Sequence, residues 1–289
     1  MSAIAEPFAY AFFVRGIIAA TLVGGLCGLL GVFVILRGMS YIGHGLSHAV
    51  FGGAVVAYVL ELNFYVGAGL WGFVSALLIH AVTRKRQIGA DAAIGIVTTA
   101  SFAIGVAIIS RARRFTKNFE AALFGNILGV TNADLAVLAC VTLATILLVF
   151  FLYKQLLFVT FDPDVAGVYG IPVNRVDALF ALMLSAGIIA SMQVLGVTMI
   201  AAAIVIPAVV ARLLTNRFST LLWLATALGA GFGIAGLYAS YYLDISSGAT
   251  IVLVAAGGFI LTLLASGLRR LPNQRVRLDS SRLVSTPID

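Results

Sequence analysis

Long apolar runs without charged residues recur along the whole chain, and each is about as long as a membrane is thick. A spanning α-helix needs about 20 mainly apolar residues, so these runs are candidate transmembrane helices. The runs of this kind are Gly16–Leu36, Tyr41–Leu60, Leu62–Thr83, Ala92–Ser110, Leu135–Tyr153, Phe218–Leu243 and Ile245–Leu268. A further run, Ala178–Ala211, is too long for one ordinary span, and we expect two helices with a turn near Ser191–Gly196. The pattern predicts an all-α polytopic membrane protein with eight or nine transmembrane helices.

The composition agrees with lipid as the solvent of this chain. Hydrophobic residues make up 62% of it, charged residues make up 10%, and the mean hydropathy is +1.11. Soluble domains carry about 25% charged residues, so an ordinary soluble fold is excluded. We expect one transmembrane domain over residues 1–268, followed by a basic cytoplasmic tail over residues 269–289.

Small residues and one proline predict details of the helix packing. The spacings Gly24-x-x-x-Gly28 and Gly229-x-x-x-Gly233 let helices approach closely in lipid. Pro207 lies inside an apolar run and is expected to break or kink its helix.

The basic residues indicate how the chain is oriented. The net charge is +7, and the basic residues lie between apolar runs and in the tail, as topology signals do. We therefore expect no nucleic-acid partner. If the loop at Arg84–Arg86 is cytoplasmic, alternation puts most lysines and arginines on that side, and the loop at Arg111–Lys117 is the exception. Nine spans would put the N-terminus outside, and eight would put it inside.

Two of the three histidines of the chain stand together in the stretch YIGHGLSHAVFGG, from Tyr41 to Gly53. Residues four apart on a helix share one face, so His44 and His48 would project together. Neutral imidazole binds zinc and other late divalent metals, and ionisable groups inside spans commonly mark transport pathways. The pair predicts a metal site, and the alternative is that both rings only hydrogen-bond across helices. The third histidine, His80, is interpreted as interfacial.

Hydrolytic chemistry is disfavoured by what the chain lacks. Position 45 is glycine, so the general base of a His-Glu-x-x-His zinc hydrolase is missing. No Gly-x-Ser-x-Gly elbow occurs, and Ser47 beside His48 would point in a different direction on a helix. The chain also has no Gly-x-x-x-x-Gly-Lys-Ser/Thr phosphate loop, so ATP, if it is used, binds to another subunit.

The stretch FDPDVAGVYGIP, from Phe161 to Pro172, has the signals of a complete short helix between two spans. Asp162 suits the N-cap, Pro163 the first turn, and Asp164 the positive helix end. Gly170 suits the C-terminal cap, and Pro172 blocks continuation. An apolar face is expected from Val165, Val168 and Tyr169. Such a helix would dock a partner, or it would only connect two spans.

Several stretches together resemble one known family. They are GLLGVFVILRGMSYIGHGLSHAVFGG, DAAIGIVTTASFAIGVAIIS, LFGNILGV, FDPDVAGVYGI, VLGVTMIAAAIVIPAVVARLL and LDISSGATIVLVAA. From about Phe12 to Leu268, the chain resembles the permease subunits of bacterial zinc and manganese ABC importers. The resemblance implies a metal-importer permease fold in the bacterial plasma (inner) membrane, working as a homodimer. It also implies a separate ABC ATPase dimer and an extracellular or periplasmic metal-binding protein.

The resemblance also implies roles for particular residues. In such permeases the first stretch commonly reads Gly-Asp-x-Leu-Ser-His-Ala, and its Asp and His are the metal contacts. His48 matches that pattern, and His44 replaces the usual Asp. A nitrogen ligand in place of an oxygen ligand favours zinc over manganese. Asp244, in YYLDISSG, would lie at the external mouth or cap the final helix. The segment from about 161 to 171 would be the ATPase-coupling helix, with Asp162, Pro163, Asp164, Gly167, Tyr169 and Gly170.

The expected function is ATP-driven import of a divalent transition metal, most of all Zn²⁺. The chain itself would have no catalytic residue and no stably bound cofactor. The alternatives are a permease for manganese, an iron chelate or a cobalamin-like molecule, and, less favoured, an intramembrane hydrolase.

Overall fold

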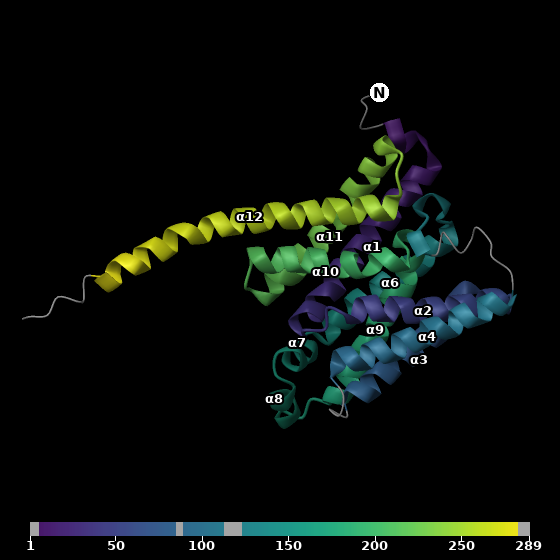
Figure 1. Cartoon of the computed structure of the whole chain (residues 1–289), viewed down its shortest axis with the longest axis horizontal. Coiled ribbons are helices and arrows are strands. Elements are labelled where there is room, and N and C mark those ends of the chain that lie inside the picture. The colour runs from purple at the N-terminus through teal and green to yellow at the C-terminus, as the bar shows by residue number, and fades with distance from the viewer. Residues whose placement is uncertain (1–5, 85–88, 113–122, 283–289) are drawn as a thin grey trace, which may run out of the picture.

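The computed structural model describes residues 6–84, 89–112 and 123–282, and in that part the regular structure is helical throughout (Figure 1). Two short 3₁₀ helices are η1 (Glu6–Ala9) and η2 (Ile127–Gly129). The α-helices are α1 (Ala11–Leu36), α2 (Ile42–Val59), α3 (Phe64–Arg84), α4 (Ala90–Ala112), α6 (Asn132–Phe151), α7 (Tyr153–Phe161), α8 (Pro163–Val168), α9 (Val173–Leu195), α10 (Val197–Leu214), α11 (Phe218–Leu243) and α12 (Ser247–Arg282).

Nine of these described helices are long and apolar enough to cross a membrane. They are α1, α2, α3, α4, α6, α9, α10, α11 and the first part of α12. The all-α polytopic fold is confirmed, and the upper of the two expected span counts fits the described helices.

The long run Ala178–Ala211 does form two helices, as expected. The turn between α9 and α10 is a single residue, Gly196, with φ 77° and ψ 158°. That region of backbone space is open essentially to glycine alone. The turn therefore falls on the last residue of the stretch in which it was predicted.

Close packing of α1 against α11 confirms the small-residue spacings. A Cβ on Gly24 would collide with the carbonyl group of Gly229, and a Cβ on Gly233 would collide with that of Ala20. Only glycine lets the two backbones approach this far. In lipid, where there is no hydrophobic drive between helices, such close contact is a main source of helix association.

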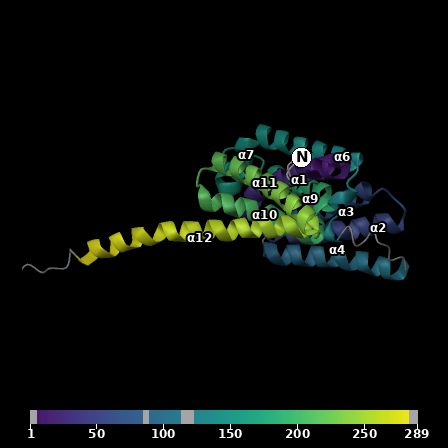
Figure 2. The ribbon, with the colours of Figure 1, turned by 90° about the horizontal axis from the view of Figure 1, so that it is seen from above.

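The helix α2 lies inside the bundle, against α3, α4, α9 and α10 (Figures 1 and 2). Its glycines show which face meets which neighbour. Gly43 lies near Ala201 of α10, Gly45 near Thr98 of α4, and Gly53 near Trp71 of α3.

The last helix does not end where a separate tail was predicted. The apolar part of α12 is Ser247–Ser266, but the helix continues to Arg282 and projects from the bundle (Figures 1 and 2). The boundary between residues 268 and 269 is thus not a break in secondary structure, and the remaining residues 283–289 lie outside the described part. A cytoplasmic location of this extension stays a prediction.

Pro207 lies inside α10, which is continuous from Val197 to Leu214, so the helix does not break there. A kink at this residue stays a prediction. Proline has no backbone N–H, so one hydrogen bond of the helix is missing at Pro207. Pro207 is buried, so this position lies inside the bundle.

Candidate metal site on α2

The two histidines of α2 share one face, as the spacing predicts. The ring centroids of His44 and His48 are 4.6 Å apart with an interplanar angle of 75°. The ring of His48 packs edge-on against that of Phe102 of α4, with 5.3 Å between the ring centroids. The ring centroids of His44 and Tyr41 are 5.6 Å apart. Both histidines are half-buried.

The histidine face is directed away from α3. Each residue turns the helix by about 100°, so the contacts of Gly43, Gly45 and Gly53 fix the wheel of α2. On that wheel, His44 and His48 point between the sides that meet α4 and α10, opposite the side that meets α3. The pair therefore borders a partly open side of this single chain.

The ring nitrogens have no partner in the described part of the chain. There, neither imidazole makes a hydrogen bond, and the role of the pair stays a prediction. The hydroxyl of Ser47 donates to the backbone carbonyl of His44 at 2.8 Å. It does not donate to an imidazole, as the nucleophile of a serine hydrolase would.

Two imidazoles alone make an incomplete metal site. Among the described residues, no group of three or more His, Cys, Asp or Glu side chains is placed to hold a metal ion. Zinc takes four ligands in most protein sites, so water, backbone or a second copy of the chain would have to supply the others.

The short helix α8 has the caps that the sequence predicts. The Asp162 carboxylate accepts from the backbone N–H of Val165 at 2.9 Å, and Pro163 opens the helix. Gly170 has φ 77°, its N–H donates to the carbonyl of Gly167 at 3.0 Å, and Ile171 N–H donates to Ala166 at 3.0 Å. This pair of bonds is a Schellman motif, which stops a helix firmly.

The apolar side chains of α8 are turned outward rather than into the bundle. Val168 is 87% exposed and Tyr169 is 74% exposed, whereas Ala166 is fully buried. Asp164 lies in the first turn, and a Cβ on Gly167 would meet no atom within 4 Å. A rigid helix with an uncovered apolar face is suited to bind another protein.

Asp244 ends α11 as its C-cap residue, in the left-handed conformation with φ 53° and ψ 46°. The next helix, α12, begins only at Ser247, so Asp244 does not stand at its start. Asp244 is exposed, and its role at an external mouth stays a prediction.

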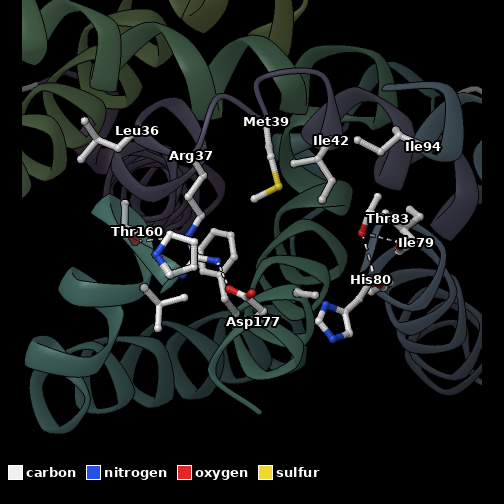
Figure 3. Close-up of a pocket in the computed structure, with 15 residues that line it drawn as sticks. Leu36, Arg37, Met39, Ile42, Ile79, His80, Thr83, Ile94, Thr160 and Asp177 are labelled. Carbon is white, nitrogen blue, oxygen red and sulfur yellow. Dashed lines mark hydrogen bonds and ion pairs between the residues drawn. The ribbon is translucent and has the colours of Figure 1, made fainter. Parts of the chain in front are cut away.

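A cavity of about 330 Å³ with a buried ion pair was not predicted from the sequence (Figure 3). Arg37 Nη1 lies 2.7 Å from Asp177 Oδ1, and Arg37 Nε donates to Thr160 Oγ1 at 3.2 Å. Burial lowers the pKa of the Arg37 guanidinium, and the Asp177 carboxylate opposes that shift. His80 also lines this cavity, although it was interpreted as interfacial. The sequence showed Arg37 only as a topology signal, because its partners lie far away along the chain.

The comparisons with known proteins agree with one another. The model of the ABC 3 transport family matches residues 9–266. The chain is 40% identical to the manganese transport system membrane protein MntC of Halalkalibacterium halodurans, over 90% of this chain and 89% of that one. It is 36% identical to the chelated iron transport system membrane protein YfeC of Yersinia pestis, over 86% of this chain and 84% of that one.

Solved structures have the same fold. PsaBC from Streptococcus pneumoniae in complex with Fab matches with a TM-score of 0.81 and 34% identity, over 90% of this chain and 95% of that one. An inward-facing putative metal-chelate type ABC transporter matches with a TM-score of 0.70 and 15% identity, over 92% of this chain and 90% of that one, which shows the fold alone.

These proteins are transport components, whose ATPase activity resides in a separate subunit, so the chain is not an enzyme. It is a multi-pass membrane protein. The chain belongs to the ABC 3 transport family, as a permease subunit of the metal ABC importer type.

Proposed function

We propose that two copies of this chain form the path through which a divalent transition metal ion enters a bacterial cell. A separate ATPase dimer drives the cycle from the cytoplasmic side, and a metal-binding protein delivers the ion from outside. The observation that carries the proposal is the pair His44 and His48, whose rings lie 4.6 Å apart on a half-buried face of α2. In the part of the chain that the structure describes, their ring nitrogens make no hydrogen bond, and ionisable side chains inside spans commonly mark transport pathways.

A homodimer would complete the metal site. Two copies related by a two-fold axis would bring the same surface together and contribute four imidazoles. The face between α4 and α10 is the side of α2 that remains partly open in one chain, which is where a second copy can approach. The ion must be held weakly, because an ion that binds too tightly cannot leave. ATP-driven rocking of the helices between two access states would release it inward.

We propose zinc as the cargo on the ligand chemistry of this pair. Imidazole nitrogen suits zinc, whereas manganese prefers carboxylate, carbonyl and water oxygens. The second candidate is manganese, and the names of relatives favour it: the similar proteins of Halalkalibacterium halodurans and Streptococcus gordonii are manganese systems. An iron chelate is the third, because the Yersinia pestis relative is named for one.

Two further roles belong to the same proposal. The helix α8, with the exposed Val168 and Tyr169, would dock in the ATPase subunit. Asp244, the exposed residue at the C-terminal end of α11, would meet incoming cations or the binding protein.

The test is uptake of radioactive zinc and manganese by the complete transporter in proteoliposomes. His44→Ala and His48→Ala should each lower uptake at limiting zinc by about 10-fold or more, since losing even an outer partner of a metal ligand costs that much. His80→Ala is the control, because this histidine lines the Arg37 cavity and not the face of α2 that carries His44 and His48. His44→Asp should shift preference toward manganese.

Each alternative has its own signature in the same assay. Unchanged uptake of both metals by both alanine variants would refute the site. If those variants also left uptake of an iron chelate intact, a bulky cargo that needs no clustered ligands would be the better reading. Hydrolytic activity of the purified chain without partners would favour the intramembrane hydrolase.

A further inference from the structure

Arg37 joins three helices at the end of the bundle that carries α7 and α8. Its guanidinium bonds Asp177 of α9 and Thr160 of α7, and its Cζ lies 4.3 Å from the ring centroid of Phe180 in α9. The side chain is only 8% exposed. Burial of the Arg37 guanidinium strengthens its bonds relative to the same bonds on a surface, although the Asp177 side chain is 32% exposed.

Arg37 and Thr160 each lie close along the chain to a part of the proposed transporter, the histidine pair on α2 and the helix α8. Arg37 directly follows α1 and opens the short connection to α2, whose first two turns carry His44 and His48. Thr160 lies in the last turn of α7, just before Asp162, the residue that caps α8. One side chain therefore joins the docking segment, α7–α8 (Tyr153–Val168), to the residue that opens the α1–α2 connection.

The surroundings of Arg37 leave room for movement. The cavity of about 330 Å³ is lined by Arg37 together with Met39 and Ile42 from the α1–α2 connection and the start of α2 (Figure 3). It is also lined by Thr160 and Pro163 from the docking segment. The second terminal nitrogen of Arg37, Nη2, is buried without a hydrogen-bond partner in the described part of the chain. A guanidinium with a spare donor beside a cavity can exchange partners when its neighbours shift.

We propose that Arg37 is a positioning residue that transmits movement of α7–α8 to the α1–α2 connection, and so to the histidine pair. This inference rests on the proposed function, since it assigns the path by which ATP-driven motion reaches the cargo. The planar fork of arginine is required, because Nε and Nη1 bond two helices at once. The Thr160 bond is the part of the contact that reaches the docking segment, and the Asp177 pair holds the fork in place.

The sharpest variant is Thr160→Val, because it removes one bond and leaves the buried ion pair intact. Removing Asp177 would leave the buried charge of Arg37 uncompensated, and removing Arg37 would break both bonds at once, so either change destabilises the region by itself. Thr83→Val is the matched control. Thr83 lines the same cavity, but its hydroxyl bonds only carbonyls of its own helix, those of Ile79 and His80, at 2.8 and 3.1 Å.

The first measurement is metal ions transported per ATP hydrolysed by the complete transporter in proteoliposomes. Thr160→Val should lower this ratio several-fold while the amount of assembled complex and its thermal stability stay as in the wild type. Thr83→Val should keep the wild-type ratio. Arg37→Lys, which preserves the charge and loses the fork, should resemble Thr160→Val. An unchanged ratio in Thr160→Val, or an equal loss in Thr83→Val, would overturn the proposal, as would a loss of assembly that accounts for the whole effect.

The second measurement does not depend on which cargo the transporter carries. A spin label at Ser40→Cys, an exposed residue of the α1–α2 connection, should report a nucleotide-dependent change in mobility in the complete transporter. The exposed Cys140 is first replaced by serine, and the buried Cys27 stays. Thr160→Val should abolish the change, and Thr83→Val should keep it. A retained change in Thr160→Val refutes the link. Failure of metal uptake in the wild type, with the spin-label response intact, would instead refute only the proposed cargo.

Discussion

At the scale of single residues, the contact between α1 and α11 gives a direct test of the packing. A methyl group on Gly24 would collide with the backbone carbonyl of Gly229, which has no rotamer with which to move aside. Gly24→Ala should therefore force the helices apart and destabilise the protein by about 1–3 kcal/mol. The measurement is thermal unfolding of the purified chain in detergent.

The neighbouring glycine supplies the control for that change. A Cβ on Gly25 would lie 3.6 Å from the Cγ2 atom of Thr226, an ordinary contact distance. Gly25→Ala should be neutral or stabilise the helix by up to about 1 kcal/mol, because alanine has the higher helix propensity. Equal loss of stability in both variants would contradict the close backbone contact between α1 and α11 at Gly24.

Residues also differ in how far their role can be predicted. The shared face of His44 and His48 follows from their spacing alone, because a helix places residues four apart together wherever it packs. The pairing of Arg37 with Asp177 does not follow, since it depends on how α1 and α9 meet in space. Each charge stands near the end of an apolar run, and that position indicates topology rather than a partner.

At the scale of elements, α8 depends on its caps because it has only 6 residues. Losing an aspartate N-cap costs about 1 kcal/mol, which is a large share of what holds so short a helix. Asp162→Ala should therefore fray α8 and lower the amount of ATPase subunit that co-purifies with the permease. Asp162→Asn should keep both, since asparagine caps as well as aspartate. Full ATPase binding to a frayed α8, as seen by hydrogen exchange over residues 163–168, would argue against docking there.

A helix with cap residues at its ends can be predicted from the sequence, whereas a helix boundary that no cap, glycine or proline marks cannot. Cap residues at both ends indicate α8. The helix α7 follows α6 after a break at Leu152, and no glycine or proline marks that break in the sequence. The extension of α12 to Arg282 does not follow from the length of a charge-free run, because charged residues form helices readily in water. For the same reason α1 begins before the expected Gly16 and includes Arg15.

At the scale of the whole molecule, the number of spans decides which connections share a side. Nine spans place the α2–α3 connection and the α10–α11 connection on opposite faces of the membrane, because α3, α4, α6, α9 and α10 lie between them. A single re-entrant run among these five would put both connections on one face. One helix of the α9–α10 hairpin is the strongest candidate for such a run, since the turn at Gly196 and both neighbouring residues are buried.

Cysteine labelling in intact cells separates these topologies. Leu62→Cys lies in the first connection and Asn216→Cys in the second, and both native residues are exposed. In a Cys140→Ser background, a membrane-impermeant maleimide should label position 62 in whole cells and position 216 only after permeabilisation. The expected side follows from Arg212 and Arg217, which flank position 216 and favour the cytoplasm. Labelling of both positions from outside would reduce the spans to eight, and the reverse pattern would invert the orientation. In either case the extension of α12 would lie outside the cell, against its expected cytoplasmic location. The reverse pattern would also put α8 outside, away from the proposed ATPase dimer.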